Sequence, residues 1–280
     1  MGGVADVLVA SDLDRTLIYS DRALALNGLD RLAPRLLCVE VLDGRPLSFL
    51  TERAASLLVE LARTAAFVPA TTRTVEQYRR VNLPGPVPGY AICANGGHLL
   101  VDGEPDQDWR REITARIAAG SAPLDDVVRQ LALSADPEWT RKRRVADGLF
   151  AYLVVDRDGL PDGWLAELAG WCAERGWRVS LQGRKVYAVP EPLRKSAALA
   201  EAVRRSGAST VLAAGDSLLD TDLLLAAHAA WRPGHGELAD SGWTAPGVTA
   251  LTEVGVTAGE EIVRRFLAAA SVTAAAALPG

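Results

Sequence analysis

The feature that most constrains the fold is a repeated alternation of short apolar runs with stretches of helical spacing. Each apolar run has the length of a buried strand and is bounded by glycine or polar turn residues. In chain order, the apolar runs and helical stretches are 7–10, 54–65, 67–70, 90–93, 196–205 and 210–214. Strands that alternate with helices in this way are typical of an α/β fold built around a parallel sheet.

The middle of the chain has a different pattern, which predicts a second unit. A helix is expected at 127–133, a strand at 149–155, an amphipathic helix at 164–175 and two strands within 177–189. This α+β unit separates two groups of strand ends that carry polar residues. We therefore predict a discontinuous core domain, residues 1–111 and 187–280, with residues 112–186 inserted as a second domain.

Composition and charge exclude several classes of protein. The 280 residues are 49% hydrophobic and 23% charged, which is enough for a sizeable core. A net charge of -5 argues against a nucleic-acid-binding surface. The basic cluster Arg141–Arg144 is short and flanked by acids, which favours a solvated surface over a polyanion site.

Cysteine usage and hydropathy indicate the compartment. No apolar run is long enough to span a bilayer. Cys38, Cys93 and Cys172 are far apart and form no CxxC pair, so a zinc site or a redox dithiol is not expected. We therefore expect a cytoplasmic protein without a membrane contact.

Two pairs of carboxylates follow predicted core strands, at the sheet edge where open parallel sheets bind ligands. Asp12 and Asp14 follow the first strand, and residues two apart on an extended chain point the same way. Asp216 and Asp220 follow the strand at 210–214. Close carboxylates repel unless a cation or a shared proton intervenes, so a divalent metal is their natural partner.

Hydrogen-bond donors occur at two further positions of the same kind. Thr71, Thr72 and Arg73 follow the strand at 67–70 and could bind a phosphoryl group. Lys195 stands at the start of a helix, where the dipole favours anions, so a further interaction must explain a cation there.

Each of these elements alone has a simpler explanation. An aspartate after a strand is often a helix cap or a turn former. Thr71 and Thr72 could cap the helix that begins near Val75, and Lys195 could be a surface lysine. The four elements occur in order, however, and together they supply a nucleophile, a metal site and a phosphate clamp.

These segments resemble the motifs of the haloacid dehalogenase (HAD) superfamily of phosphatases. Asp12-x-Asp14-x-Thr16 resembles the first motif, Thr71 the second, Lys195 the third and Gly215-Asp216-x-x-x-Asp220 the fourth. The inserted unit lies between the second and third motifs, where C2-type caps lie, and it resembles the C2B caps of Cof-like, sucrose-phosphate phosphatase and phosphomannomutase relatives. Ala94-Asn95-Gly96-Gly97 resembles an Asn-Gly element of those branches.

The resemblance implies a Rossmann-like core with a C2B-type cap and an Mg²⁺-dependent hydrolysis of a small phosphate monoester. The expected substrate is a sugar phosphate or a related metabolite. Asp12 would be the nucleophile that forms an aspartyl-phosphate, and Asp14 the general acid/base. Asp12, the backbone carbonyl of Asp14 and Asp216 would hold Mg²⁺, with Asp220 as a direct or indirect ligand.

The same resemblance implies which residues bind the phosphoryl group and the rest of the substrate. Thr71 and Lys195 would bind the transferring oxygens and stabilise their charge in the transition state. The predicted phosphate- and substrate-binding residues are Thr71, Thr72, Arg73, Asn95, Lys195 and Ser217.

The sequence also departs from the family pattern. Arg15 and Thr72 stand where relatives usually have glycine, and each side chain could alter substrate choice or point outward. A longer segment after the first motif leads into a predicted hairpin, residues 38–50, that turns at Asp43-Gly44 and could cover the site or decorate the sheet edge. His235 could line the site or lie in a surface loop.

Alternatives to a phosphohydrolase remain. A phosphomutase would use the same groups but would retain and reorient the intermediate. A catalytically silent phosphoester-binding protein would not need the acid/base Asp14. A nucleotide-binding Rossmann protein is the weakest alternative, because no GxGxxG and no Walker-type lysine loop is present. The substrate and the oligomeric state stay open.

Overall fold

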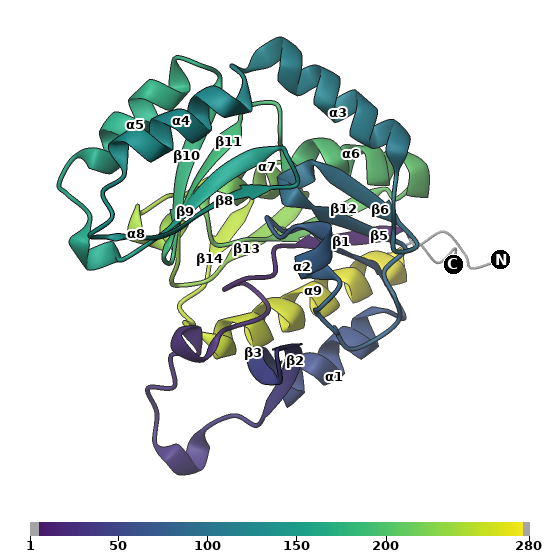
Figure 1. The fold of residues 1–280 in the computed structure, drawn as a ribbon. Helices are drawn as coiled ribbons and strands as arrows, with labels where there is room; N and C mark the ends of the chain where they lie inside the picture. The colour runs from purple at the N-terminus through teal and green to yellow at the C-terminus, as the bar shows by residue number, and fades with distance from the viewer. Residues whose placement is uncertain (1–5, 277–280) are drawn as a thin grey trace. The chain divides into compact units, whose positions relative to one another are not determined.

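The computed structural model describes residues 6–276 and divides into two compact units (Figure 1). The core unit comprises Met1–Pro105 and Lys195–Gly280, and the inserted unit comprises Asp106–Arg194. The boundaries expected from the sequence, 112 and 186, fall inside α3 (Gln107–Gly120) and β11 (Lys185–Pro190). The observed boundaries therefore fall between helices and strands and not inside them.

A five-stranded sheet forms the centre of the core unit, in the order β14-β13-β12-β1-β4. All four neighbouring pairs are parallel, which confirms the predicted α/β class. The strands are β1 (Val7–Ser11), β4 (Ala66–Pro69), β12 (Thr210–Ala214), β13 (Ala229–Arg232) and β14 (Val248–Ala250). All five residues of β1 are buried, which explains its continuous apolar run.

Two helices of the core unit lie side by side and share one hydrophobic cluster with β1 (Figure 1). They are α1 (Glu52–Leu61) and α9 (Val256–Ala276). Leu61 of α1 and Phe266 of α9 are fully buried in this cluster with Val9. Thr51 caps α1, because its side chain accepts a hydrogen bond from the backbone N–H of Ala54 at 2.9 Å.

The core unit also contains one longer helix, α6, and several short ones. α6 begins at the predicted motif lysine and packs on α7. The bounds are α2 (Val75–Tyr78), α6 (Lys195–Ser206), α7 (Thr221–Leu225) and α8 (Glu237–Asp240), with 3-10 turns η1 (Asp21–Ala23), η2 (Asp30–Leu32), η3 (Ala94–Gly96) and η5 (Leu218–Asp220).

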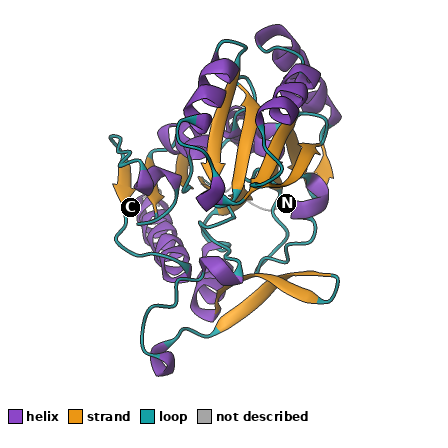
Figure 2. Cartoon of the chain, turned by 60° about the vertical axis from the view of Figure 1, so that its left-hand side comes forward, coloured by secondary structure: helices purple, strands orange, loops and turns teal. Residues whose placement is uncertain are grey.

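The predicted hairpin is confirmed as β2 (Leu36–Leu42) and β3 (Arg45–Thr51), an antiparallel pair (Figure 2). Its turn residues Asp43 and Gly44 both have positive φ, 51° and 72°, as a tight hairpin turn requires. The hairpin is fixed to the rest of the core unit by backbone bonds. The N–H of Tyr19 donates to the carbonyl of Phe49 at 2.8 Å, and the N–H of Asn82 donates to the carbonyl of Val39 at 2.7 Å.

A small antiparallel sheet extends the core unit beyond β4. It contains β5 (Tyr90–Cys93), β6 (His98–Val101) and β7 (Glu104–Pro105). A single parallel bridge links Ala70 to Ile92 of β5. The apolar run predicted at 90–93 is therefore a strand, but it belongs to this separate sheet.

The inserted unit is an α+β structure with an antiparallel sheet of order β10-β11-β9-β8. Helices α4 and α5 pack on β9 and β10, and the indole N–H of Trp164 in α5 donates to the carbonyl of Ser134 in α4 at 2.8 Å. Besides α3 and β11, the elements are α4 (Leu124–Ser134), β8 (Thr140–Ala146), β9 (Phe150–Val155), η4 (Arg157–Gly159), α5 (Trp164–Ala173) and β10 (Trp177–Gln182).

The basic cluster Arg141–Arg144 lies in the edge strand β8, with all four residues exposed. The sequence did not predict this strand, because residues 141–145 are all exposed and no alternation of buried and exposed positions marks it. Exposed charges on an edge strand oppose pairing with another chain. Within residues 6–276, no helix is both long and apolar enough to cross a membrane.

Candidate active site

Three buried carboxylates meet where two adjacent core strands end. Asp12 follows β1, and Asp216 and Asp220 follow β12. The two strands are parallel neighbours with Ser11 opposite Ala214, and the N–H of Asp12 donates to the carbonyl of Ala214 at 2.9 Å. One carboxylate oxygen of each aspartate lies within 4.8 Å of the others. The register of β1 and β12 thus joins the first and fourth motifs.

Lys195 lies against this carboxylate cluster and is fully buried. Its Nζ donates to Oδ1 of Asp12 at 2.6 Å and to Oδ1 of Asp220 at 2.5 Å. Burial alone would lower the pKa of Lys195, but the two carboxylates raise it above its usual value. Two protein carboxylates therefore supply the interaction that the sequence required for a cation at this helix start. The N-terminus of α6 is capped separately, because Oδ2 of Asp222 accepts from the N–H of Ser196 at 2.8 Å.

The cluster carries more negative than positive charge. Burial raises the pKa of Asp12 to about 7, with further contributions from Asp220 and Asp14 that Lys195 opposes. Burial, Asp12 and Asp220 likewise raise the pKa of Asp216 well above its usual value. A divalent cation would relieve this repulsion, and carboxylate oxygens are the ligands that Mg²⁺ prefers.

The loop after β12 is folded around Asp220. Oδ2 of Asp220 accepts from the N–H of Ser217 at 2.9 Å, from its hydroxyl at 2.7 Å and from the N–H of Asp216 at 3.2 Å. Since Oδ1 is bonded to Lys195, both oxygens of Asp220 are engaged. This arrangement favours Asp12 and Asp216 as direct metal ligands and Asp220 as the residue that holds them in place.

Two glycines allow the backbone to approach these carboxylates closely. A Cβ at Gly215 would lie 2.4 Å from the Cβ of Asp220, and a Cβ at Gly236 would lie 2.5 Å from Oδ2 of Asp216. Gly236 also has a φ of 92°, which side chains rarely adopt. Glycine is therefore required at both positions by the geometry of the cluster.

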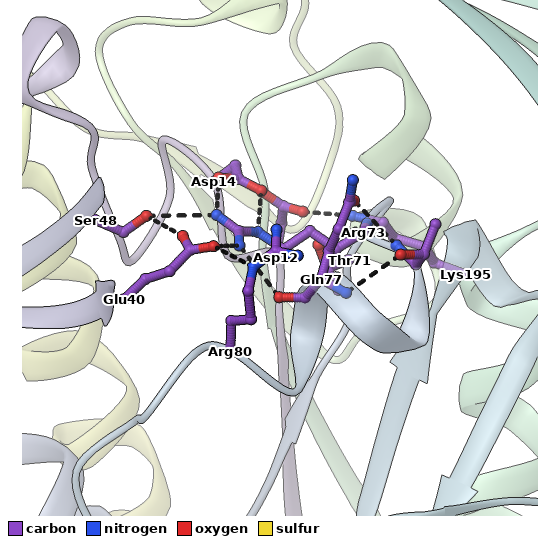
Figure 3. A network of polar contacts seen from close by, with 10 residues as sticks. Asp12, Asp14, Glu40, Ser48, Thr71, Arg73, Gln77, Arg80 and Lys195 are labelled. Atoms are coloured by element: carbon purple, nitrogen blue, oxygen red, sulfur yellow. Dashed lines mark hydrogen bonds and ion pairs between the residues drawn. The ribbon is translucent and has the colours of Figure 1, made fainter. Parts of the chain in front are cut away.

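Asp14 has different partners from Asp12, although it is two residues away (Figure 3). The guanidinium of Arg73 donates to both of its oxygens, from Nε at 2.7 Å and from Nη2 at 2.8 Å. The side chain of Asp14 is 40% exposed, against 7% for Asp12. Arg73, which we predicted to bind phosphate, is thus directed at Asp14.

The second motif lies next to this pair. Thr71 is fully buried, and its hydroxyl accepts from the N–H of Arg73 at 3.1 Å. The carbonyl of Thr71 accepts from the N–H of Asn95 at 2.9 Å, which brings the Asn-Gly element to the second motif. The alternative role of Thr71 and Thr72 as helix caps is wrong, since Thr74 caps α2 in a capping box.

No protein-family model matches the chain, and no curated protein matches it either. Solved structures do match over nearly its whole length. The sucrose-phosphatase from Synechocystis sp. PCC6803, in complex with sucrose and phosphate, has a TM-score of 0.66 and 16% identity, covering 93% of this chain and 98% of that one. The HAD subclass IIB sugar phosphatase BT4131 has a TM-score of 0.56 and 12% identity, covering 92% and 98%.

A third similar structure is the C-terminal domain of the trehalose-6-phosphate phosphatase from C. albicans, with a TM-score of 0.53 and 12% identity, covering 96% of this chain and 92% of that one. The chain has the fold of the HAD superfamily phosphatases. At these identities the likeness concerns the fold, and the chemistry of this chain has to be argued from its own residues.

Arg15 lies inside the first motif, at the position where the resemblance predicted glycine. Its φ is 66°, a conformation that glycine adopts more readily. Its side chain does not point away from the site, because Nε lies 3.4 Å from Oδ2 of Asp216. The chain therefore places a second cation beside the carboxylate cluster.

His235 lies beside the first motif rather than in a detached surface loop. Its Nε2 is 2.8 Å from the carbonyl of Arg15, and its Nδ1 accepts from the N–H of Gly255 at 3.1 Å. These contacts assign a neutral imidazole with the proton on Nε2. Burial lowers the pKa of His235, which agrees with the neutral form. His235 thus supports the unusual backbone of Arg15.

The sequence did not identify three residues that belong to the polar network around Arg73. Glu40 and Ser48 from the hairpin and Arg80 after α2 join Arg73 in one polar network (Figure 3). Glu40 did carry a signal, since it is a single acid in the otherwise apolar strand Leu36–Leu42. Its partners are far away in sequence and could not be read from that strand.

Proposed function

We propose that the chain is an Mg²⁺-dependent phosphohydrolase that cleaves a small phosphate monoester through an aspartyl-phosphate on Asp12. The observation that carries this proposal is the buried cluster of Asp12, Asp216 and Asp220 around Lys195, with Asp14 two residues from Asp12 in a different environment. A metal site, a nucleophile and a separate proton-transfer group are what this reaction requires.

In the first step an oxygen of Asp12 attacks phosphorus. The bond from phosphorus to the leaving oxygen breaks, its electron pair stays on that oxygen, and Asp14 in its protonated form delivers the proton. In the second step a water oxygen attacks phosphorus, and its proton passes to Asp14. The bond to Asp12 breaks with its electron pair returning to the carboxylate. Inorganic phosphate is released and both aspartates are restored.

The metal and the phosphate clamp follow from the donors that lie in the cluster. Asp12, Asp216 and the backbone carbonyl of Asp14 would hold Mg²⁺, with Asp220 supporting them, and the bound ion would stabilise negative charge on the transferred oxygens. Lys195 and Thr71 would bind those oxygens from the protein side. We also retain Thr72, Asn95 and Ser217 as proposed substrate-binding residues.

We propose a sugar phosphate or a related metabolite as the substrate, with the inserted unit acting as the cap of the fold. Two similar structures are a sucrose-phosphatase and a sugar phosphatase, and a third is a trehalose-6-phosphate phosphatase domain. This support is an analogy of fold and does not name one compound.

A phosphate-release assay with the purified protein tests the proposal. A panel of sugar phosphates, nucleotides and other phosphate monoesters would be incubated with Mg²⁺, with excess chelator, and with Asp12→Asn as the blank. We expect release from sugar phosphates that requires both Mg²⁺ and Asp12. Rates that persist in chelator would contradict the metal, and transfer to a second sugar position without release would favour a phosphomutase.

A further inference from the structure

The guanidinium of Arg73 has its hydrogen-bonding capacity filled by the core unit itself (Figure 3). Besides the two bonds to Asp14, Nη1 lies 2.9 Å from Oε1 of Glu40 and 3.5 Å from the carbonyl of Gln77, and Nη2 lies 3.4 Å from the hydroxyl of Ser48. A guanidinium has five N–H groups, and these contacts occupy five directions. A phosphate-binding role for Arg73 would require it to give up one of them.

Glu40 fixes the side of Arg73 that faces away from Asp14. The Glu40 side chain is 2% exposed and interacts with Ser48, Arg73 and Arg80. Oε2 accepts from the Ser48 hydroxyl at 2.6 Å, and Oε1 lies 3.4 Å from Nε of Arg80. Burial would raise the pKa of Glu40, but the bonds from Arg73 and Ser48 lower it, so the carboxylate is ionised. A buried charge with this many partners is held in one place.

Two of the groups that contact Arg73 come from one hairpin. Glu40 and Ser48 are cross-strand partners in the β2–β3 hairpin. The hairpin is anchored to the rest of the core unit by backbone bonds to Tyr19 and Asn82. From the sequence, this hairpin could either cover the site or extend the sheet edge. Its geometry instead directs a carboxylate at the arginine that holds Asp14.

We propose that Glu40 is a positioning residue that acts through Arg73 to orient Asp14 for the hydrolysis of the phosphoenzyme. This inference rests on the proposed function. In that step a water oxygen attacks the phosphorus of the aspartyl-phosphate, the bond to Asp12 breaks with its electron pair, and the water proton passes to Asp14. A bidentate guanidinium fixes the plane of a carboxylate, so the Asp14 oxygen that takes the water proton is held in one orientation.

The kinetics of an activated ester separate this role from general damage to the protein. The p-nitrophenolate leaving group needs no proton, so formation of the phosphoenzyme from p-nitrophenyl phosphate should depend little on Asp14. The ratio kcat/KM reports that first step, whereas kcat includes hydrolysis of the phosphoenzyme. Slowing only the second step lowers kcat and KM together and leaves kcat/KM unchanged.

The test compares Glu40→Ala with Glu52→Ala, a control at the first residue of α1, directly after the hairpin. Glu52 forms an ion pair with Arg35 at 3.2 Å that is exposed on both sides. For Glu40→Ala we expect kcat and KM for p-nitrophenyl phosphate to fall about tenfold together. This loss is smaller than the roughly 10²- to 10⁴-fold effect of removing a general base. Acid-quenched samples should contain more phosphoenzyme than wild type. Glu40→Gln keeps an acceptor oxygen for Arg73 and should lie between Glu40→Ala and wild type.

A parallel loss of kcat and kcat/KM, or values equal to those of Glu52→Ala, would overturn the inference. A crystal structure of Glu40→Ala provides a readout that needs no turnover. The inference requires the contact between Arg73 and Asp14 to be lost or rearranged there, and an unchanged contact refutes it. Absence of hydrolysis by the wild-type protein would instead refute the proposed function, and the crystal structure would still decide whether Glu40 holds Arg73.

Discussion

Asp12 and Asp14 are two residues apart, yet the fold gives them opposite surroundings. Asp12 is buried against the Lys195 ammonium and shares its site with two more carboxylates. Asp14 is 40% exposed and is bound by the guanidinium of Arg73, which also forms an ion pair with Glu40. Asp12 therefore lies among other carboxylates, whereas Asp14 is paired with a positively charged guanidinium.

The difference shows how one motif can supply two chemical roles. Two carboxylates perform different tasks when their environments separate their protonation behaviour. Asp12 belongs to the cluster of three carboxylates, where its attacking oxygen would lie next to the phosphorus of the substrate. Asp14 lies outside that cluster, where it has room to exchange a proton with water or a leaving group.

Asp12→Asn is expected to have the largest effect. Because an amide cannot form the acyl phosphate, activity should fall on the order of 10⁴-fold or more. No phosphoenzyme should form, even with p-nitrophenyl phosphate. Rates and acid-quenched samples measure both outcomes. Asp43→Asn, at the hairpin turn where asparagine is equally suitable, is the matched control. Substantial turnover by Asp12→Asn would remove Asp12 from the nucleophile role.

Asp14→Asn should slow the reaction in a different way. Loss of the general acid/base should lower kcat on the order of 10²- to 10⁴-fold. With p-nitrophenyl phosphate, however, the phosphoenzyme should form and accumulate, because that leaving group needs no proton. If Asp14→Asn yields no phosphoenzyme, like Asp12→Asn, the two aspartates do not divide the roles as proposed.

Much of the cluster around Asp12 could be predicted from the sequence, for a physical reason. Parallel strands place their carboxyl ends at one edge of a sheet, so polar residues that follow separate strands meet there. Asp12, Asp216 and Lys195 are each adjacent to an element whose start or end is clear in the sequence. Their meeting required only that β1 and β12 be neighbours, which the structure shows.

The surroundings of Asp14 could not be predicted in the same way. Arg73 was expected to face a phosphoryl group, and its contact with Asp14 spans 59 residues of sequence. Glu40 reaches Arg73 only because the hairpin is attached to the core unit, and no local pattern specifies that attachment. Strand β8 shows the same limit, since five successive exposed residues give it none of the alternation that marks a half-buried strand.

The metal-free protein should lose stability as the pH rises, through Asp12. Its pKa is raised to about 7 in the folded state, against about 3.9 when unfolded. Below both values the carboxyl is neutral in either state, so its burial is tolerated. Between pH 4 and 7 the unfolded chain releases the proton first, so the free energy of unfolding should fall by up to about 4 kcal/mol.

Chemical denaturation between pH 5 and 8 in chelator measures this effect, as the difference between wild type and Asp12→Asn. The wild-type protein should lose stability relative to the variant as the pH rises, and Mg²⁺ should remove most of the loss. The opposite trend would show that Lys195 stabilises the Asp12 carboxylate more than burial and the neighbouring acids destabilise it.

Arg15→Gln is expected to have the smallest effect, on metal affinity. The Arg15 guanidinium lies 3.4 Å from Asp216 and its side chain is 34% exposed, so solvent screens part of the interaction. Removing the charge should tighten Mg²⁺ binding about two- to fivefold, measured by titration calorimetry. Glutamine keeps the side chain at the same backbone position with φ of 66°, whereas glycine would also relieve strain. Arg22→Gln, at an exposed site, should leave the affinity unchanged. Weaker Mg²⁺ binding by Arg15→Gln would mean that Arg15 holds Asp216 in place as a ligand instead of competing with the ion for it.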